Sequence, residues 1–359
     1  MPMTDINHAS SKDVYFLCDH LGIGGAERVM CSLINYFDDQ GYKVTVLLKH
    51  QFRIDYHLND SITIDFLNWG HGLVGRIRDC IRLRKRIKRG VVIAFLYSAN
   101  RDALLLTAGN RNVSLILSER NDPSRIPEKY YQRLIRNIVY LFADKIVFQT
   151  RDAMKMFPKS VQNKGKIIMN PLTDEILNNE IMIDGKDLVT LSRLDEQKNL
   201  FFMIDVFYLI SGKYSDSRLL IYGEGPLKKD LEIYIKRRRL EDRCFLKGYV
   251  KDVWKDEVKK CRAYLSTSNY EGVSNSIMEA LSLGIPVVAT DCPIGGTKML
   301  IDNGINGFIV EMNNIDLFYD AVSKIMEDDS LAQRLHQNAL CIREKFSIKK
   351  IGEEWEKLL

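Results

Sequence analysis

Residues 263–291 read AYLSTSNYEGVSNSIMEALSLGIPVVATD, and this stretch decides the fold class. It opens with an apolar run at 263–266 that is typical of a buried strand, and it ends with another at 286–289. Between the two runs, Ser274 or Asn275 is a suitable N-cap for a helix, and Gly284 is a suitable stop. A strand, a helix and a second strand in this order predict two parallel strands joined by a crossover helix.

The same alternation extends in both directions along the chain. Further strands are predicted at 14–18, 43–48, 62–66, 91–96, 114–117 and 145–149, and at 188–191, 218–222, 244–246 and 308–310. Amphipathic helices are predicted at 26–37, 128–142, 200–210 and 227–238. Strands that alternate with helices are typical of parallel sheets whose two faces are both covered by helices.

A polar stretch that opens with Asn170-Pro171 interrupts the alternation and has few helix or strand signals. We therefore predict an α/β protein with two doubly wound, Rossmann-like domains. The first is expected at 1–170, the linker at 171–186 and the second domain at 187–341. The domains are expected to face each other across a cleft, with ligands at the carboxyl ends of the strands.

Composition excludes several protein classes. The chain has 359 residues, of which 46% are hydrophobic and 28% charged, as in globular proteins with two ordinary domains. Its seven cysteines include no Cys-x-x-Cys pair, which indicates reduced, buried thiols rather than a disulfide framework or a zinc site. Residues 1–12 are polar, and no apolar run is long enough to cross a bilayer, so we expect no export signal and a cytoplasmic location.

Positive charge is concentrated in the first half of the chain. Residues 1–180 carry 26 Lys and Arg against 19 Asp and Glu, a net charge of +7, whereas residues 181–359 carry 26 against 28. Much of the excess lies at 76–89, RIRDCIRLRKRIKR, which has eight basic residues and one acidic residue.

The apolar residues of segment 76–89 recur at roughly helical spacing, which predicts a basic amphipathic helix. They are Ile77, Ile81, Leu83 and Ile87. Two interpretations stay open: a solvated surface helix, or peripheral contact with the anionic inner face of the plasma membrane. Nucleic acid is not expected as a partner, because the chain has no RNA-binding signature and no zinc finger.

The first predicted strand runs into LGIGGAER at 21–28. Glycines in a strand-to-helix turn let a ligand approach the backbone, and the N-terminus of the next helix attracts anions. A nicotinamide cofactor would need a third glycine in GxGxxG spacing and an acid at the end of the second strand. Both are missing, since that strand ends Leu48-Lys49-His50. A tight turn without a ligand stays open as an alternative.

Two loops in the second half carry the groups that a phosphate site needs. SRLDEQKN, at 192–199, places Arg193 and Lys198 between a strand and a helix, at the carboxyl end of the strand. Two cations at this position suit a diphosphate, which accepts several charge-assisted hydrogen bonds, although each alone is typical of a protein surface. The next junction, YGEGP, has Gly223 and Gly225 on either side of an acid.

Residues 271–279 add two carboxylates. Glu271 precedes the predicted helix and Glu279 lies inside it, while the first amides of the helix, at 275–277, form an anion site. One carboxylate on each side of a phosphate site can accept hydrogen bonds from the hydroxyls of a sugar nucleotide. An acid inside a helix is otherwise usually solvated.

Together, these motifs resemble those of the retaining glycosyltransferases of family 4, which have the GT-B fold. The matching motifs are GGAER, SRLDEQKN, YGEGP, EGVSNSIMEALSLGIPVVATD and GINGFIV. The resemblance is specific at 188–310 and weaker at 14–150, a region that in this family adapts to the acceptor. It implies a nucleotide-sugar donor, retention of anomeric configuration, and a C-terminal helix at 342–359 that crosses back to the N-terminal domain.

The resemblance also implies a role for each matched residue. Arg193 and Lys198 would neutralise the diphosphate leaving group. Glu271, the third catalytic candidate, would hold hydroxyls of the transferred sugar, and Glu279 would hold those of the ribose. The other implied substrate-binding residues are Gly24, Gly25, Gly223, Gly225, Tyr249, Val250, Gly272, Ser274, Asn275, Ser276 and Ile277.

The chain departs from the family pattern at two positions. The family often has a histidine near the sugar, where this chain reads SERN at 118–121, so Glu119 and Arg120 join the predicted substrate-binding residues. Lys298 stands where the family commonly has a glutamate. Either change could alter the choice of donor.

We therefore predict retaining transfer of a UDP-linked hexose or N-acetylhexosamine to a glycan or lipid-linked saccharide, in surface polysaccharide or lipopolysaccharide synthesis. Uridine follows from family frequency, and the basic first domain favours a lipid-linked acceptor. No Asp-x-Asp triplet occurs, so we expect no metal and no cofactor, with cations and helix amides stabilising the leaving group instead. Two alternatives stay open: a UDP-sugar 2-epimerase of the same architecture, and a non-catalytic subunit that binds nucleotide sugar.

Overall fold

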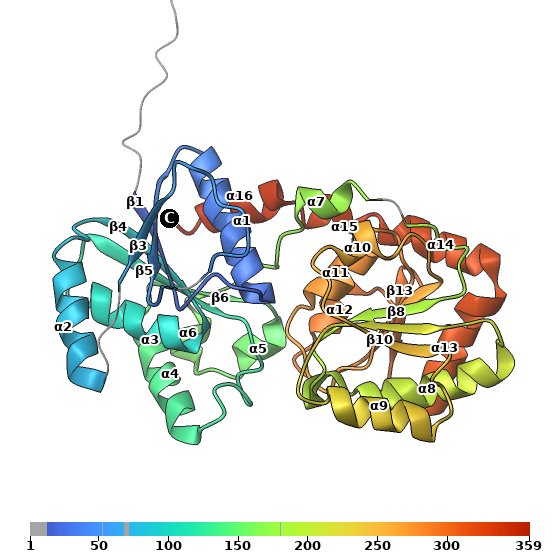
Figure 1. Cartoon of the computed structure of the whole chain (residues 1–359). Helices are drawn as coiled ribbons and strands as arrows, with labels where there is room; N and C mark the ends of the chain where they lie inside the picture. The colour runs from blue at the N-terminus through green and yellow to red at the C-terminus, as the bar shows by residue number, and fades with distance from the viewer. Residues whose placement is uncertain (1–12, 52, 68–71, 180) are drawn as a thin grey trace, which may run out of the picture. The chain divides into compact units, whose positions relative to one another are not determined.

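A computed structural model describes residues 13–51, 53–67, 72–179 and 181–359 (Figure 1). The chain divides into two compact units. Unit 1 comprises Met1–Gln149, Ala153–Pro171 and Ile348–Leu359, and unit 2 comprises Thr150–Asp152 and Leu172–Ser347. The segment predicted as a linker therefore clusters with unit 2, apart from its first residue, and it contains the short helix α7 (Asp174–Leu177).

Unit 1 is built on a seven-stranded parallel sheet with the order β3-β2-β1-β4-β5-β6-β7. The strands are β1 (Asp13–Cys18), β2 (Lys43–Leu48), β3 (Thr63–Phe66), β4 (Gly90–Phe95), β5 (Val113–Glu119), β6 (Lys145–Phe148) and β7 (Gly165–Ile167). Its helices are α1 (Gly25–Asp39), α2 (Gly72–Arg84), α3 (Leu96–Thr107), α4 (Tyr130–Phe142), α6 (Lys159–Gln162) and α16 (Ile348–Glu356), and α5 (Arg151–Lys155) spans the boundary with unit 2.

Helices cover both faces of this sheet, because successive strand residues point to opposite sides. Leu117 and its alternate neighbours share one buried cluster with residues of α2, α3 and α4. On the opposite face, Phe16 lies against Phe37 of α1, and Phe95 stacks on Trp355 of α16 with ring centroids 5.6 Å apart.

Unit 2 is built on a six-stranded parallel sheet with the order β10-β9-β8-β11-β12-β13. The strands are β8 (Leu188–Leu191), β9 (Leu219–Tyr222), β10 (Cys244–Gly248), β11 (Ala263–Ser266), β12 (Val287–Thr290) and β13 (Gly307–Val310). The longer helices are α8 (Leu200–Lys213), α9 (Lys228–Arg237), α11 (Asn275–Ser282), α13 (Ile315–Glu327) and α14 (Asp329–Ala339); the short ones are η1 (Glu196–Lys198), α10 (Val253–Asp256), α12 (Gly296–Leu300) and α15 (Ile342–Lys345).

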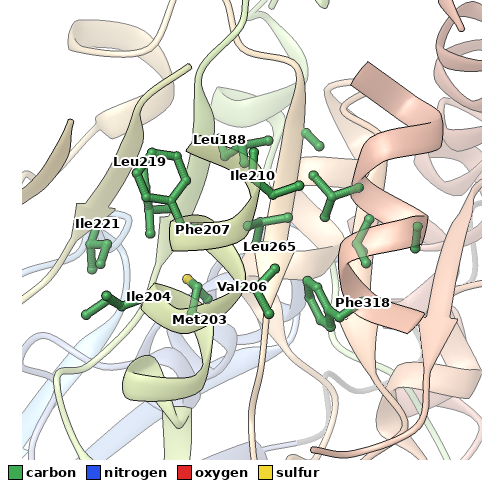
Figure 2. Close-up of a cluster of buried hydrophobic side chains, with 14 of the residues drawn as sticks. Leu188, Met203, Ile204, Val206, Phe207, Ile210, Leu219, Ile221, Leu265 and Phe318 are labelled. Carbon is green, nitrogen blue, oxygen red and sulfur yellow. The ribbon is translucent and has the colours of Figure 1, made fainter. Parts of the chain in front are cut away.

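The core of unit 2 lies between the sheet and helices α8 and α13. Figure 2 shows Phe207 of α8 and Phe318 of α13 directed toward Leu188 and Leu265 of the central strands. All four side chains are fully buried. The apolar runs predicted as strands are therefore buried because helices cover the sheet, as the alternation of strands and helices indicated.

The predicted helix at 76–89 is wrong in length and in its apolar stripe. Helix α2 ends at Arg84. Leu83 and Ile87 are buried, whereas Ile77 and Ile81 are 42% and 54% exposed. At about 3.6 residues per turn, Ile81 and Leu83 lie on roughly opposite sides of the helix, so the four residues cannot share one buried face.

Smaller differences concern the ends of elements. Leu96, predicted as the end of a strand, begins α3 with a φ of 69°, and Glu119, predicted to follow a strand, is the last residue of β5. The three-residue strand β7 was not predicted. Among the described residues, no helix has both the length and the apolar character that spanning a bilayer requires.

Strand order reverses once in each sheet, between β1 and β4 in unit 1 and between β8 and β11 in unit 2. In doubly wound sheets, ligands bind outside the carboxyl ends of the strands at such a reversal. The reversal in unit 2 separates the two loops in which most of the predicted site residues lie.

Candidate functional site

Lys198 and Glu271 form a partly buried ion pair beyond the carboxyl ends of β8 and β11. Lys198 Nζ contacts Glu271 Oε2, and the two side chains are only 14% and 15% exposed. Ser268 Oγ donates a second hydrogen bond to the same oxygen at 3.2 Å. Burial alone would lower the pKa of Lys198, but the charge and hydrogen bond of Glu271 outweigh it and hold that pKa above its ordinary value. Lys198 is therefore a positioned, permanently charged group at neutral pH.

Hydrogen bonds between the two loops fix the backbone around Lys198. Thr267 Oγ1 donates to the carbonyls of Lys198 and Asn199 at 2.9 and 3.1 Å. The amide of Asn269 donates to the carbonyl of Gln197 at 2.7 Å. Asn199 has a φ of 49°, a left-handed conformation that asparagine tolerates better than most residues. The loop after β8 is thus held by the loop after β11.

Arg193 lies in the same loop as Lys198 but is 69% exposed. Its guanidinium donates to Gln197 Oε1 at 2.9 Å and lies 3.2 Å from Asp195 Oδ2. Gln197 in turn donates to the carbonyl of Tyr270 at 3.0 Å. The positive charge of Arg193 also opposes protonation of Lys198, which places the two cations in one electrostatic environment.

Helix α11 begins where the sequence predicted it. Ser274 is the N-cap, and its Oγ accepts a hydrogen bond from the amide of Ile277 at 3.5 Å. The hydroxyls of Ser274 and Ser276 lie 3.1 Å apart. The first turn of α11 therefore presents amide and hydroxyl groups and the positive end of the helix dipole beside the loop that carries Glu271.

Tyr264 connects these parts and was missed by the sequence analysis. Its hydroxyl donates to the carbonyl of Leu191 at 3.1 Å and accepts from the amide of Leu191 at 3.2 Å. Burial raises the pKa of Tyr264, while a hydrogen bond to Ser276 and the charge of Lys198 act against that rise. A tyrosine within an apolar strand predicts only a core residue, so the motif gave no signal for this position.

Glu279 lies inside α11 and is buried. Its Oε2 accepts a hydrogen bond from Trp254 Nε1 at 3.1 Å. Trp254 comes from α10 and was also missed, because nothing in the sequence relates its indole to a carboxylate 25 residues later.

The predicted glycines at 223, 225 and 272 are in close backbone contacts. A Cβ on Gly223 would lie 1.9 Å from the carbonyl oxygen of Ser192, and one on Gly225 would lie 2.4 Å from that of Leu194. The carbonyl of Gly272 lies against Gly296 in the same manner. These contacts give Gly223, Gly225 and Gly296 a packing role, whatever Gly223 and Gly225 contribute to binding. The remaining candidates in unit 2, Tyr249 and Val250, follow β10 and are exposed and half-buried.

In unit 1, Gly24 and Gly25 stand at the N-terminus of α1. Tyr56 Oη donates to the carbonyl of Gly24 at 3.0 Å and accepts from its amide at 3.2 Å. A Cβ on Gly24 would lie 2.0 Å from Glu27 Oε2, so the Glu27 carboxylate covers this turn. Burial raises the pKa of Glu27.

Glu119 points from the end of β5 toward α4. Its Oε2 accepts a hydrogen bond from Tyr140 Oη at 3.0 Å and lies 3.6 Å from Arg136 Nη1. Burial raises the pKa of Glu119, although Arg136 and Tyr140 counteract part of that rise.

Arg120 points to the opposite side of the sheet, as the next residue along an extended chain should. Its guanidinium carbon lies 4.2 Å from the ring centroid of Phe95 and 5.8 Å from that of Trp355. Nη1 donates to Asn170 Oδ1 at 2.6 Å, while Nε and Nη2 have no hydrogen-bond partner in the described part of the chain. Burial lowers the pKa of Arg120.

A second charged cluster lies at the strand reversal of unit 1. Lys49 Nζ lies 2.6 Å from Asp19 Oδ1 and 2.6 Å from Asp102 Oδ2, and it donates to Ser98 Oγ at 2.9 Å. Asp19 and Lys49 each follow a strand directly, and because β1 and β2 are parallel neighbours this position could have been noticed in the sequence. The described residues include no group of three or more His, Cys, Asp or Glu side chains arranged to hold a metal ion.

Comparison with known proteins finds that this chain is similar to glycosyltransferases. The family model for "Glycosyl transferases group 1" matches residues 175–340. An uncharacterized glycosyltransferase of Methanocaldococcus jannaschii is 27% identical over 348 residues, covering 82% of this chain and 84% of the relative. A second relative, from Campylobacter jejuni, is N-acetylgalactosamine-N,N'-diacetylbacillosaminyl-diphospho-undecaprenol 4-alpha-N-acetylgalactosaminyltransferase; it is 26% identical over 366 residues, covering 94% and 97% of the two chains.

A solved structure shows the same fold over the whole chain. HepE of Anabaena, in complex with UDP-glucose, matches with a TM-score of 0.80 at 17% identity, covering 96% of this chain and 98% of that one. The family model, the relatives and the shared GT-B fold together support a glycosyltransferase.

Proposed function

We propose that this protein moves a hexose or N-acetylhexosamine from a UDP donor to a glycan or lipid-linked saccharide, with retention of configuration and without a metal ion. The observation that carries the proposal is the partly buried Lys198–Glu271 pair at the strand reversal of unit 2, beside the N-terminus of α11. Support comes from the UDP-glucose bound to HepE and from the diphospho-undecaprenol-linked saccharide in the name of the Campylobacter relative.

Lys198 and Arg193 stabilise the leaving group in this proposal. Negative charge grows on the diphosphate as the glycosidic bond breaks, and groups held in place beforehand stabilise that charge without reorganisation. Lys198 is held by Glu271, and Arg193 by Asp195 and Gln197. The first amides of α11, at 275–277, supply the positive end of a helix dipole.

Glu271 and Glu279 hold the sugar ends of the donor. Glu271 accepts hydrogen bonds from hydroxyls of the transferred sugar while it keeps Lys198 in place. Glu279, already positioned by Trp254, accepts from the ribose hydroxyls. The backbone at Tyr249 and Val250 meets the base. Substrate contacts from Gly24, Gly25, Glu119, Arg120, Gly223, Gly225 and Gly272 stay predictions.

Retention follows when the acceptor attacks from the side that the leaving group vacates. The bond between the anomeric carbon and the diphosphate oxygen breaks, and a bond to the acceptor oxygen forms. The acceptor proton passes to a phosphate oxygen of the departing UDP, so no protein base is required. We place the reaction in the cytoplasm at the inner face of the plasma membrane, in surface polysaccharide or lipopolysaccharide synthesis, where the exposed cations of segment 76–89 contact anionic lipid.

Product analysis tests the proposal. The protein is incubated with UDP-hexoses and UDP-N-acetylhexosamines, with and without a lipid-linked saccharide and with and without EDTA. We expect a new glycoside with the donor's anomeric configuration, at a rate unchanged by EDTA. Epimerised donor without acceptor would identify a UDP-sugar 2-epimerase, and no turnover of any donor would identify a binding subunit.

Lys198→Ala is expected to lower kcat/KM by about 10²–10³-fold, because one positioned group that stabilises the leaving group is lost. Lys213→Ala is a matched control, since Lys213 pairs with Glu327 on the surface of unit 2 and its removal should leave turnover unchanged. Far-UV circular dichroism and melting temperature check that both variants are folded. Near-normal turnover of Lys198→Ala would contradict the proposed role.

A further inference from the structure

Helix α4 of unit 1 presents its apolar side to solvent. The side chains that lie outward, each between 38% and 68% exposed, are Tyr130, Tyr131, Leu134, Ile135, Ile138, Leu141 and Phe142. The buried residues of the same helix are Arg136, Val139 and Tyr140. A surface helix of a globular protein normally has the reverse arrangement, with its apolar stripe facing the core.

Buried polar contacts hold α4 in this orientation. Arg136 Nη1 donates to the carbonyls of Pro123 and Ile126 at 2.9 and 2.8 Å and lies 3.6 Å from Glu119 Oε2. Tyr140 Oη donates to the same carboxylate. Rotating the helix to bury its apolar side would leave these polar groups without partners, at a high cost in the interior. These buried contacts therefore stabilise the orientation in which the apolar side of α4 faces solvent.

The neighbouring helices α2 and α3 also expose apolar side chains. Helix α3 contacts both α2 and α4, so the three helices form one layer over the sheet (Figure 1). Leu105 of α3 is exposed, as are Ile77 and Ile81 of α2. Apolar side chains gathered on adjacent helices mark an interaction surface, whereas single exposed ones are common on any protein.

The charged residues of the α2–α3–α4 layer indicate which kind of partner this surface binds. Helix α4 contains no acidic residue, and Lys129 precedes it directly. On α2, Arg78 and Arg82 are mostly exposed, while the acid between them, Asp79, is buried 3.5 Å from each guanidinium. Aliphatic and aromatic side chains with basic residues around them suit an anionic bilayer, where the apolar groups enter the acyl boundary and the cations meet phosphates. Two copies of this surface would instead bring positive charge against positive charge.

We propose that the outer surface of the α2–α3–α4 layer docks on anionic membranes, with the apolar side chains of α4 inserted at the headgroup–acyl boundary. This inference deepens the lipid-linked acceptor of the proposed function and rests on it in that respect, but docking itself requires no turnover. The basic segment 76–89 attracts the protein to anionic lipid over a long range. The apolar side chains of α4 then contact the acyl chains once they have entered the headgroup–acyl boundary.

Vesicle flotation tests the surface directly. The whole protein is mixed with phosphatidylcholine vesicles that contain none or about one third phosphatidylglycerol. We expect Leu134→Gln/Ile138→Gln to lower the partition coefficient on anionic vesicles by at least about tenfold, because two apolar side chains no longer enter the boundary. Ile233→Gln is the matched control, since Ile233 is an equally exposed isoleucine on α9 of unit 2, and it should bind as the wild type does.

A charge variant separates the two contributions. Arg82→Glu/Arg84→Glu should weaken binding to anionic vesicles and make it less sensitive to salt, but leave the weak binding to phosphatidylcholine unchanged. Unaltered flotation of the Leu134→Gln/Ile138→Gln variant would overturn the proposal. So would a dimer in size-exclusion chromatography that this variant dissociates while vesicle binding persists, because the surface would then join two copies.

Lys198→Ala distinguishes docking from catalysis. This variant should float with anionic vesicles as the wild type does, although its kcat/KM for sugar transfer is lower by about 10²–10³-fold. The Leu134→Gln/Ile138→Gln variant should turn over a water-soluble acceptor at the wild-type rate. If no transfer is ever observed but flotation behaves as expected, the proposed function fails and the docking surface stands.

Discussion

Glu119 and Arg120 are adjacent in sequence, yet they meet opposite surroundings. Glu119 accepts a hydrogen bond from Tyr140 and lies near Arg136, whereas Arg120 stacks on Phe95 and donates a hydrogen bond to Asn170. Both side chains are buried, and desolvation favours the neutral form of each. Burial therefore raises the pKa of Glu119 and lowers that of Arg120. Strand geometry decides these environments, because consecutive side chains leave the sheet on opposite faces.

The raised pKa of Glu119 predicts a pH-dependent effect of Glu119→Gln. The folded state binds the Glu119 proton more tightly than the unfolded state, so the wild type loses stability as pH rises above about 4.3 through the folded-state pKa. Glutamine does not titrate. We therefore expect the variant to become more stable relative to the wild type between pH 4.5 and pH 7, so that the difference in free energy of unfolding (variant minus wild type) increases by less than about 1.4 kcal/mol per pH unit. Urea unfolding at both pH values measures it, and a difference that does not vary with pH would contradict the shift.

Residues in local motifs could be predicted, and residues joined only by packing could not. Lys198 and Glu271 lie in short loops whose limits are set by predicted strands and helices on either side. The structure brings the two side chains into contact. Tyr264 is 73 residues from the backbone groups that it binds, and Trp254 is 25 residues from Glu279. No periodicity or spacing in the sequence encodes such distant pairs.

Among the elements, the turn after β9 packs closely on the backbone of a neighbouring loop. The YGEGP turn lies on the loop after β8, and the amide of Leu194 donates to the carbonyl of Glu224 at 3.0 Å. Gly223 has a φ of 137°, a conformation that residues with a side chain rarely adopt. This packing places the loop that carries Arg193 and Lys198.

Gly223→Ala is therefore expected to destabilise unit 2 by about 2–4 kcal/mol and to weaken donor binding, since the new methyl group meets the Ser192 carbonyl in a strained conformation. Gly212→Ala is the control: it lies in α8, and nothing stands within 4 Å of its Cβ position. That change should be neutral or stabilising by up to about 1 kcal/mol. Chemical unfolding compares the two variants, and equal effects would refute the packing role of Gly223.

The sequence did not predict which side of α2 or α4 faces the core, because the same residues permit either orientation of the helix. The apolar residues at 76–89 satisfy an approximate helical spacing, yet α2 buries Leu83 and leaves Ile81 exposed. In α4, the apolar stripe was predicted without its direction, and buried Arg136 decides that direction by its contacts. Periodicity reports that a helix has two sides, but packing selects which side faces the core.

For the molecule as a whole, the residues that we propose for donor binding lie almost entirely in unit 2, within or beside the region that the family model matches. A ligand that binds only the folded state stabilises it by RT ln(1 + [L]/Kd), about 2.7 kcal/mol at a hundredfold excess over Kd. Donor choice can therefore be measured on the intact chain before any acceptor is known.

We expect UDP and UDP-sugars to raise the melting temperature of the intact protein, and GDP- and ADP-sugars to have smaller effects. EDTA should not change the result. Lys198→Ala should abolish most of the shift, because the diphosphate loses the partly buried cation that would pair with it, whereas Lys213→Ala should keep the shift. Equal shifts with all three bases would refute uridine selectivity, and a shift that survives Lys198→Ala would refute the proposed phosphate site.

The sequence by itself determined the α/β class, the order of strands and helices, and the loops that hold Arg193, Lys198 and Glu271. These features depend on local periodicity, on caps such as Ser274 and on breaks such as Gly284, all of which act over a few residues. The tertiary structure alone decided that Lys49 meets Asp19 and Asp102, and that α4 turns its apolar side outward. Those outcomes depend on contacts between distant segments, whose free energies become defined only when the sheets and helices pack together.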